Sequence, residues 1–255
     1  MSYINNDGIA IHYHVEGEGP ALVLQHGQGD NMQAWYDAGH VAALKSRYKL
    51  ILVDARGHGE SDKPYSPDAY HISQNVADII AILDELSIDK AHYWGHSMGG
   101  RIGFGCAKYA GSRFHSLIIS SMSPYKRPKV ERDVAIAQYN KGVEAILSDR
   151  RAEGDLTLEE EDRIRANDPL AQAASLTAVR DFPDQVDTLK YMTMPSLVYV
   201  GELDTFWREG LEKCVGDIPH ATFVLLPGLG HQEALERGDI VLPHVEKFLT
   251  DVGEA

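Results

Sequence analysis

One serine stands in a setting suited to chemistry, the segment WGHSMGG at residues 94–100, in which it is Ser97. The segment follows an apolar, aromatic run and precedes a helix-like stretch. The G-x-S-x-G spacing is typical of a tight strand-to-helix turn, in which Gly95 and Gly99 avoid a steric clash because they lack a Cβ. Such a turn exposes the serine hydroxyl, and the positive end of the following helix stabilises an oxyanion beside it. We therefore predict that Ser97 is a nucleophile.

A serine hydroxyl needs a base, and a histidine base needs an acid that orients it. Both residue types follow strand-like runs further along the chain. The run at 195–201 leads into a turn that presents Asp204, and the run at 222–226 leads into the segment PGLGH, which ends at His231. We predict that Asp204 is the acid and His231 the base.

An early strand-like run ends in the loop HGQG at residues 26–29, which we expect to lie beside Ser97. An oxyanion hole requires two backbone N–H groups, and the natural pair is that of Met98, directly after the nucleophile, and that of Gln28 in this loop. We expect His26 to hydrogen-bond the loop backbone and to take no part in the chemistry.

Alternating strand and helix patterns must position these residues. In the helix expected at 73–86 the apolar residues recur at spacings of three and four, which indicates one buried face. Asp54 ends a strand-like run, but we interpret it as a residue that caps the following turn. We expect strands at residues 9–15, 21–25, 48–54, 90–94, 114–120, 195–201 and 222–226, with 2–5 as an edge strand.

Together these motifs resemble those of the α/β-hydrolase family over essentially the whole chain. The order Ser97, Asp204, His231 is the order of that family, and the segment DARGHGES at residues 54–61 is similar to its D-x-R-G-x-G-x-S turn. The resemblance implies an α/β fold with an eight-stranded, mostly parallel sheet, helices on both faces, and an active site at the carboxyl ends of the strands. It gives Glu202 and Glu233 no required role.

The segment at 122–183 lacks strand-like runs and carries helical patterns at 130–151, 158–166 and 170–179. In similar hydrolases a helical cap between the sixth and seventh core strands covers the nucleophile. We therefore expect a cap at 122–183 that interrupts a core made of residues 1–121 and 184–255. Because the cap is rich in Ala, Ile, Leu and Val, we expect a mostly apolar pocket, with Tyr125, Tyr139 and the core residue Trp207 as candidate walls.

Composition limits the partners. The 255 residues include 38 Asp and Glu against 24 Lys and Arg, a net charge of −14, which repels nucleic acid and anionic membranes. The start of the chain lacks the pattern of a secretory signal, and no window is apolar enough to span a bilayer. We expect a cytoplasmic protein with a small-molecule substrate, no nucleic-acid or membrane partner, and reduced thiols at Cys106 and Cys214. The oligomeric state stays open.

A serine at the elbow implies acyl chemistry, whereas related halide- and epoxide-processing enzymes carry an aspartate there. The leading hypothesis is a carboxylesterase or lactonase that acts on small, largely apolar substrates through an acyl-enzyme, with no cofactor or metal. Alternatives are hydrolysis of a carbon–carbon bond in a ring-cleavage product, perhydrolase or lyase activity, and a slow-turnover ligand receptor like some plant hormone receptors.

Overall fold

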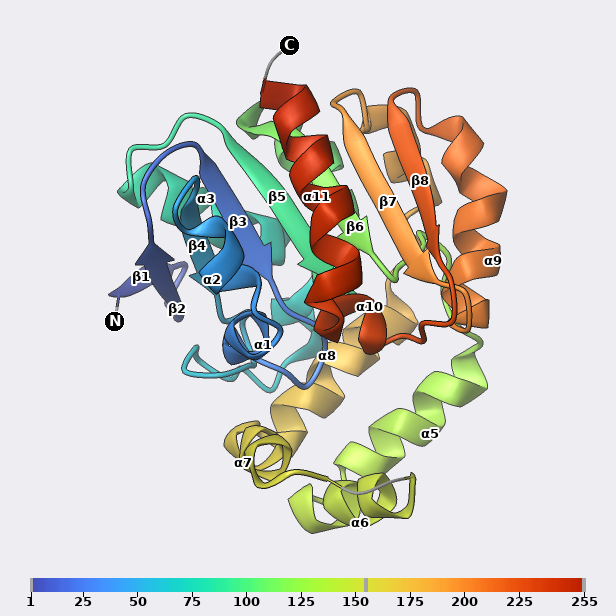
Figure 1. Ribbon diagram of the computed structural model, residues 1–255. Coiled ribbons are helices and arrows are strands. Elements are labelled where there is room, and N and C mark those ends of the chain that lie inside the picture. The colour runs from blue at the N-terminus through green and yellow to red at the C-terminus, as the bar shows by residue number, and fades with distance from the viewer. Residues whose placement is uncertain (1, 154–155, 254–255) are drawn as a thin grey trace.

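A mixed sheet of eight strands forms the centre of the computed structural model, which describes residues 2–153 and 156–253 (Figure 1). The strand order is β1-β2-β4-β3-β5-β6-β7-β8; β2 pairs antiparallel with β1 and β4, and all other pairs are parallel. The expected fold is confirmed. The strands are β1 (Ser2–Asn6), β2 (Ile9–Glu16), β3 (Ala21–Gln25), β4 (Lys49–Val53), β5 (Ala91–His96), β6 (Phe114–Ser120), β7 (Ser196–Gly201) and β8 (Ala221–Leu226).

The central strands are buried on both faces, so successive side chains enter two different cores. In β3, Val23 joins one core and Leu22 and Leu24 join the other. The first core lies under helices α3 (Ile72–Glu85), α4 (Met98–Ala110) and α9 (Thr205–Cys214). The second lies under α1 (Gln33–Asp37), α2 (His40–Leu44), α10 (Glu233–Glu236) and α11 (Gly238–Gly253). Figure 1 shows α11 crossing this second face.

Several predicted elements agree closely with the structure. The helix expected at 73–86 is α3, and each expected strand overlaps an observed one. Cys106 in α4 and Cys214 at the end of α9 are buried free thiols. Within the described ranges, no helix combines the length and apolar character needed to cross a membrane.

In the described residues, four α-helices and then the 3₁₀-helix η3 (Val186–Tyr191) lie between β6 and β7, and Figure 1 shows the four α-helices projecting beyond the carboxyl ends of the strands. They are α5 (Lys129–Tyr139), α6 (Val143–Glu153), α7 (Leu158–Ala166) and α8 (Pro169–Asp181). The single helix predicted at 130–151 is wrong, because Gly142 adopts a positive φ of 94° and separates α5 from α6.

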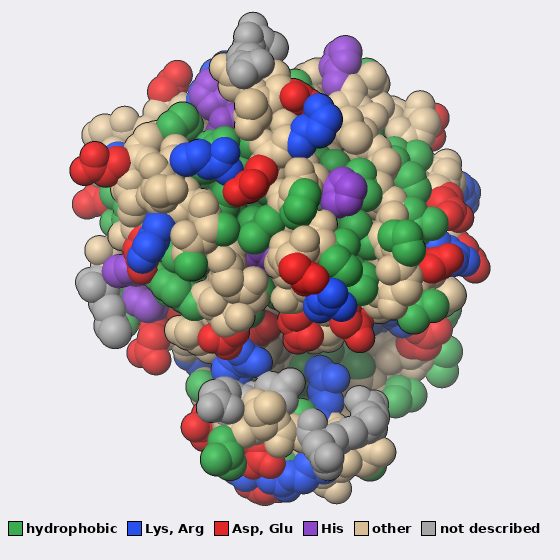
Figure 2. Space-filling model, viewed as in Figure 1, with side chains coloured by type: hydrophobic (Ala, Val, Ile, Leu, Met, Phe, Trp, Pro, Cys, Tyr) green, Lys and Arg blue, Asp and Glu red, His purple; other side chains and the backbone are tan. Residues whose placement is uncertain are grey.

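The surface is hollowed where these helices meet the core, and charged side chains gather along that border (Figure 2). Arg163 of α7 forms ion pairs there with Asp37 and, at 3.8 Å, with Asp30. The division into a core and a cap with boundaries at 122 and 183 stays a prediction.

Candidate active site

Ser97 lies at a sharp turn between β5 and α4, with backbone angles φ 52° and ψ −111°. Its N–H donates to the carbonyl of Ser120 at 2.9 Å. The turn requires glycine at positions 95 and 99, because a side chain at either would clash with the backbone. A Cβ on Gly95 would lie 2.2 Å from the carbonyl oxygen of Gly99, and one on Gly99 would lie 2.1 Å from that of Gln25. The tight turn expected around Ser97 is therefore present.

The structure brings Ser97, Asp204 and His231 together from the ends of three strands. Nε2 of His231 lies 2.9 Å from Oγ of Ser97, and Nδ1 lies 2.6 Å from Oδ2 of Asp204. Asp204 is buried and directly precedes α9, whereas the His231 side chain is about one-third exposed. This arrangement can pass a proton from the hydroxyl to an imidazole whose tautomer the carboxylate fixes.

Two glutamates near these residues shape the loop that carries His231. A carboxylate oxygen of Glu202 accepts from the N–H of Gly228 at 2.9 Å, and one of Glu233 accepts from the N–H of Gly230 at 3.1 Å. Both therefore support the loop, and neither hydrogen-bonds the imidazole.

The loop after β3 lies against Ser97, since a Cβ on Gly27 would be 3.4 Å from the Cβ of Ser97. Gln28 and Met98 line the same cavity as Ser97. Among the described residues, neither backbone N–H of this pair has a hydrogen-bond acceptor, which leaves both available to an oxyanion. His26 is buried; its Nδ1 bonds the carbonyl of Gly27 at 2.7 Å and its Nε2 accepts from the N–H of Ala55. Its expected structural role is confirmed.

Asp54 likewise serves the turns around it. Its carboxylate accepts from the N–H groups of Met32 and Glu60, at 2.8 and 3.0 Å, and Oδ2 lies 2.8 Å from Nδ1 of His12. The interpretation of Asp54 as a structural residue is confirmed.

Gln172 connects helix α8 to the loop that carries Gln28. Its side chain is fully buried; Nε2 donates to the carbonyl of Gly57 at 2.9 Å, and Oε1 accepts from Nε2 of Gln28. Ser175, on the same helix, donates to Oε1 of Gln28 at 3.3 Å. Helix α8 thus holds the side chain of Gln28, which lines the same cavity as Ser97.

A cavity of about 180 Å³ contains Ser97 and His231 and joins a second cavity of about 330 Å³. Trp207 lines both and Tyr125 lines the larger one, but Tyr139 lines neither. Instead, this end of α5 packs against α8 and places the phenol of Tyr139 beside the loop after β3, in a small separate cavity with Gln28, so its role in the pocket stays a prediction. The residues common to both cavities are Arg101, Met122, Arg132, Val179 and Trp207.

The expectation of a mostly apolar wall agrees with the larger cavity, whose lining is mainly apolar, but not with the smaller cavity at Ser97. Three arginines line the smaller cavity: Arg101, Arg127 and Arg132. Much of the apolar surface of α5 and α8 is used to pack these helices together, through Ile136 and Leu176 among others. Arg101 could have been found from the sequence, because it lies one helical turn after Ser97 and so shares its face of α4. Arg132 and Gln172 carry no local signal.

Within the described ranges, no group of three or more His, Cys, Asp or Glu side chains is arranged to hold a metal ion. The chemistry that the geometry offers is carried by side chains and backbone amides.

Comparisons with known proteins agree with this geometry. A family model described as the alpha/beta hydrolase fold matches residues 20–236. A Bacillus subtilis (strain 168) protein provisionally named 2-succinyl-6-hydroxy-2,4-cyclohexadiene-1-carboxylate synthase is 26% identical over 95% of this chain and 96% of its own length. The 3-oxoadipate enol-lactonase 1 of Acinetobacter baylyi is 34% identical over 46% of this chain and 43% of its own. The crystal structure of an enol-lactonase from Burkholderia xenovorans LB400 superposes with a TM-score of 0.87 at 24% identity, covering 98% of this chain and all of the other.

Proposed function

The chain belongs to the alpha/beta hydrolase fold family, and we propose that it is a serine hydrolase that cleaves carboxylic esters or lactones. The observation that carries the proposal is the position of one imidazole, with its two ring nitrogens 2.9 Å from the Ser97 hydroxyl and 2.6 Å from the Asp204 carboxylate. The similarity to the Acinetobacter enol-lactonase supports the ester and lactone class.

In the proposed reaction Oγ of Ser97 attacks the substrate carbonyl while Nε2 of His231 takes the hydroxyl proton. Asp204 accepts a hydrogen bond from Nδ1 and stabilises the imidazolium. The N–H groups of Gln28 and Met98 donate to the oxyanion, and the N-terminus of α4 adds its positive partial charge.

The imidazolium then returns its proton to the leaving oxygen as the carbon–oxygen bond breaks, which leaves an ester on Ser97. In the second half His231 takes a proton from water, whose oxygen attacks that ester. The tetrahedral intermediate that forms then collapses. The imidazolium of His231 returns the proton to Oγ of Ser97, and the acid is released. No further reactant is required.

The test begins with Ser97. Ser97→Ala should lower the turnover of 4-nitrophenyl esters by about 10⁴-fold or more while the protein stays folded. A fluorophosphonate should label Ser97 in peptide mass spectra, and Ser148→Ala, at an exposed serine of α6, serves as the control. A label on another serine, or near-normal turnover by Ser97→Ala, would contradict the assignment.

A second variant tests the orienting acid. Asp204→Asn keeps the shape of the side chain but cannot stabilise the imidazolium, so turnover should again fall by about 10⁴-fold. Esters, lactones and ring-fission diketones assayed side by side separate the proposed reaction from carbon–carbon bond hydrolysis. Turnover confined to the diketones would favour the latter.

A further inference from the structure

Two arginines at the junction of the two cavities have unpaired guanidinium groups. Arg101 comes from α4 of the core and Arg132 from α5 of the cap, and both line the cavity that contains Ser97. Across the described ranges 2–153 and 156–253, neither guanidinium donates a hydrogen bond or forms an ion pair. Both side chains are only partly accessible to solvent.

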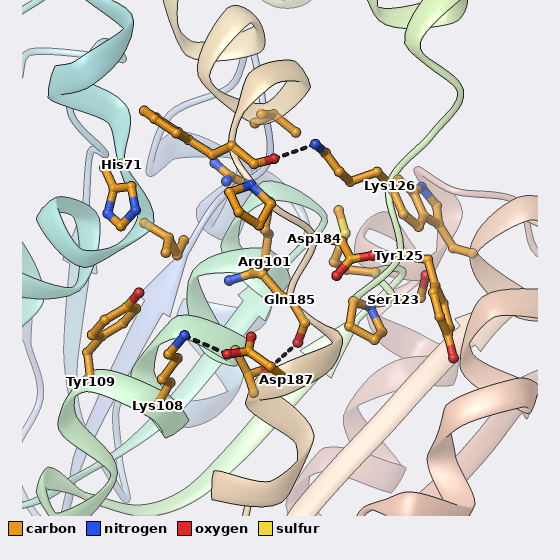
Figure 3. A pocket seen from close by; sticks show the side chains of 18 of the residues that line it. His71, Arg101, Lys108, Tyr109, Ser123, Tyr125, Lys126, Asp184, Gln185 and Asp187 are labelled. Atoms are coloured by element: carbon orange, nitrogen blue, oxygen red, sulfur yellow. Dashed lines mark hydrogen bonds and ion pairs between the residues drawn. The ribbon is translucent and has the colours of Figure 1, made fainter.

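The other cations around these cavities already have partners, as Figure 3 shows for two of them. Lys108 pairs with Asp187 at 2.7 Å, and Nζ of Lys126 donates to the carbonyls of Arg180, at 2.9 Å, and Phe182. Arg127 pairs with the neighbouring Glu131 and stacks on Trp207. Among the described lysines and arginines that line these cavities, Arg101 and Arg132 are therefore the two without a partner.

Burying the unpaired guanidinium groups of Arg101 and Arg132 is energetically costly. Burial, and then the neighbouring charge of Arg132, lower the pKa of Arg101 to about 10, which still leaves the group cationic at neutral pH. Burial also lowers the pKa of Arg132, and the charge of Arg127 adds to this effect. Two like charges in a partly dry cavity repel each other, and an anion placed between them would offset both the repulsion and the desolvation.

The chemistry of the pair selects the kind of anion. A guanidinium presents its N–H groups in a planar fork that matches the two oxygens of a carboxylate. Two such forks, one from the core and one from the cap, can share a single carboxylate, and Figure 3 shows Arg101 within the larger cavity.

We propose that Arg101 and Arg132 form a carboxylate-binding site and that the substrate is an ester or lactone that also carries a carboxylate group. This rests on the proposed hydrolase function. The carboxylate lies at the junction of the two cavities, the reacting carbonyl lies at Ser97 in the smaller one, and the rest of the substrate extends into the larger one.

Two esters that differ only in charge test the site. Mono(4-nitrophenyl) glutarate carries a free carboxylate, whereas methyl 4-nitrophenyl glutarate has the same chain with that group masked. The wild-type protein should have a higher kcat/KM for the anion. Arg101→Gln and Arg132→Gln should each lower that value by about 10- to 100-fold, while the value for the masked ester changes less than about threefold.

Arg101→Lys and Arg47→Gln complete the set. Lysine keeps the charge but loses the fork, so Arg101→Lys should recover only part of the preference. Arg47 forms an exposed ion pair with Glu246 away from the cavities, and Arg47→Gln should leave both esters unaffected. Equal losses for both esters, or no preference in the wild type, would overturn the proposal.

Binding without turnover separates this proposal from the hydrolase assignment. Calorimetry on Ser97→Ala should detect binding of glutarate, which the additional Arg101→Gln or Arg132→Gln change abolishes, and no binding of dimethyl glutarate. If wild-type protein cleaves neither ester but Ser97→Ala binds glutarate through the arginines, the carboxylate site stands and the hydrolase assignment fails. If the masked ester is cleaved and glutarate does not bind, the carboxylate site is refuted.

Discussion

Four buried histidines should make this fold sensitive to acid. They are each at most 5% exposed: His40, His58, His92 and His96. Burial lowers the pKa of His40 to about 4, that of His58 to about 3, that of His92 to about 4 and that of His96 well below its ordinary value. The nearby charge of His26 adds to the shift of His58, and that of His115 to the shift of His92.

The sign and size of the effect follow from proton linkage. In the unfolded chain each imidazole has its ordinary pKa of about 6.5, so below that pH the unfolded chain binds more protons than the folded one. The free energy of unfolding is therefore unaffected by these groups above about pH 6.5 and falls as the pH drops toward 4. At pH 5 each histidine costs about 2 kcal/mol, or about 8 kcal/mol for the four. That is a large part of a typical total of about 5–15 kcal/mol.

Urea unfolding followed by circular dichroism at pH 8, 6 and 5 measures this loss directly. Near pH 5 the four groups should give an uptake of about four protons on unfolding. His58→Asn isolates one of them, because the amide can replace Nδ1 as the donor to the carbonyl of Arg56, 3.1 Å away, but does not titrate. This variant should take up about one proton fewer, whereas His220→Asn, at an exposed position, should match the wild type. A loss below about 2 kcal/mol between pH 8 and 5 would refute the reasoning.

Two further predictions concern packing around Ser97. Gly99→Ala should cost more than about 3 kcal/mol of unfolding free energy, because its Cβ meets the backbone carbonyl of Gln25. Gly111→Ala, at the end of α4, lies nearest the movable terminal methyl of Met194, at 3.4 Å, and should cost less than about 1 kcal/mol; equal costs in denaturant titrations would contradict this. Gln172→Leu should cost about 2–4 kcal/mol and lower kcat, because the buried carbonyl of Gly57 and the partly buried amide of Gln28 each lose a hydrogen bond; unchanged kcat and melting temperature would show that the contact is dispensable.

The positions of Ser97, Asp204 and His231 could be predicted because each lies at or shortly after the carboxyl end of a strand. Parallel strands bring their carboxyl ends to one edge of the sheet, so local pattern was enough to place distant residues together. Their catalytic roles stay predictions. Arg132 could not be predicted, because the face that α5 turns toward the cavity is decided by its packing against α8, and that contact is not encoded in either helix alone.

The break between α5 and α6 shows a second limit. A lone glycine within a helical pattern is tolerated at a cost of about 1 kcal/mol, so Gly142 does not by itself predict an end to the helix. Because Gly142 adopts a positive φ, α5 ends before it and a separate helix, α6, begins directly after it. Patterns of single residues indicate helices well, but they do not decide where a chain turns when only one residue interrupts the pattern.

The unpaired arginines lie in a chain whose net charge is −14. At a distance, the summed negative potential slows the diffusional approach of any anion, and physiological salt limits that potential to about 8 Å. Inside the cavity, the two arginines make the local potential positive, opposite to that of the whole chain. Counterions of the solution have little access to them there. Raising ionic strength should therefore speed the encounter with an anionic substrate more than it weakens the bound complex. This salt response is opposite to that of enzymes that steer their substrates electrostatically.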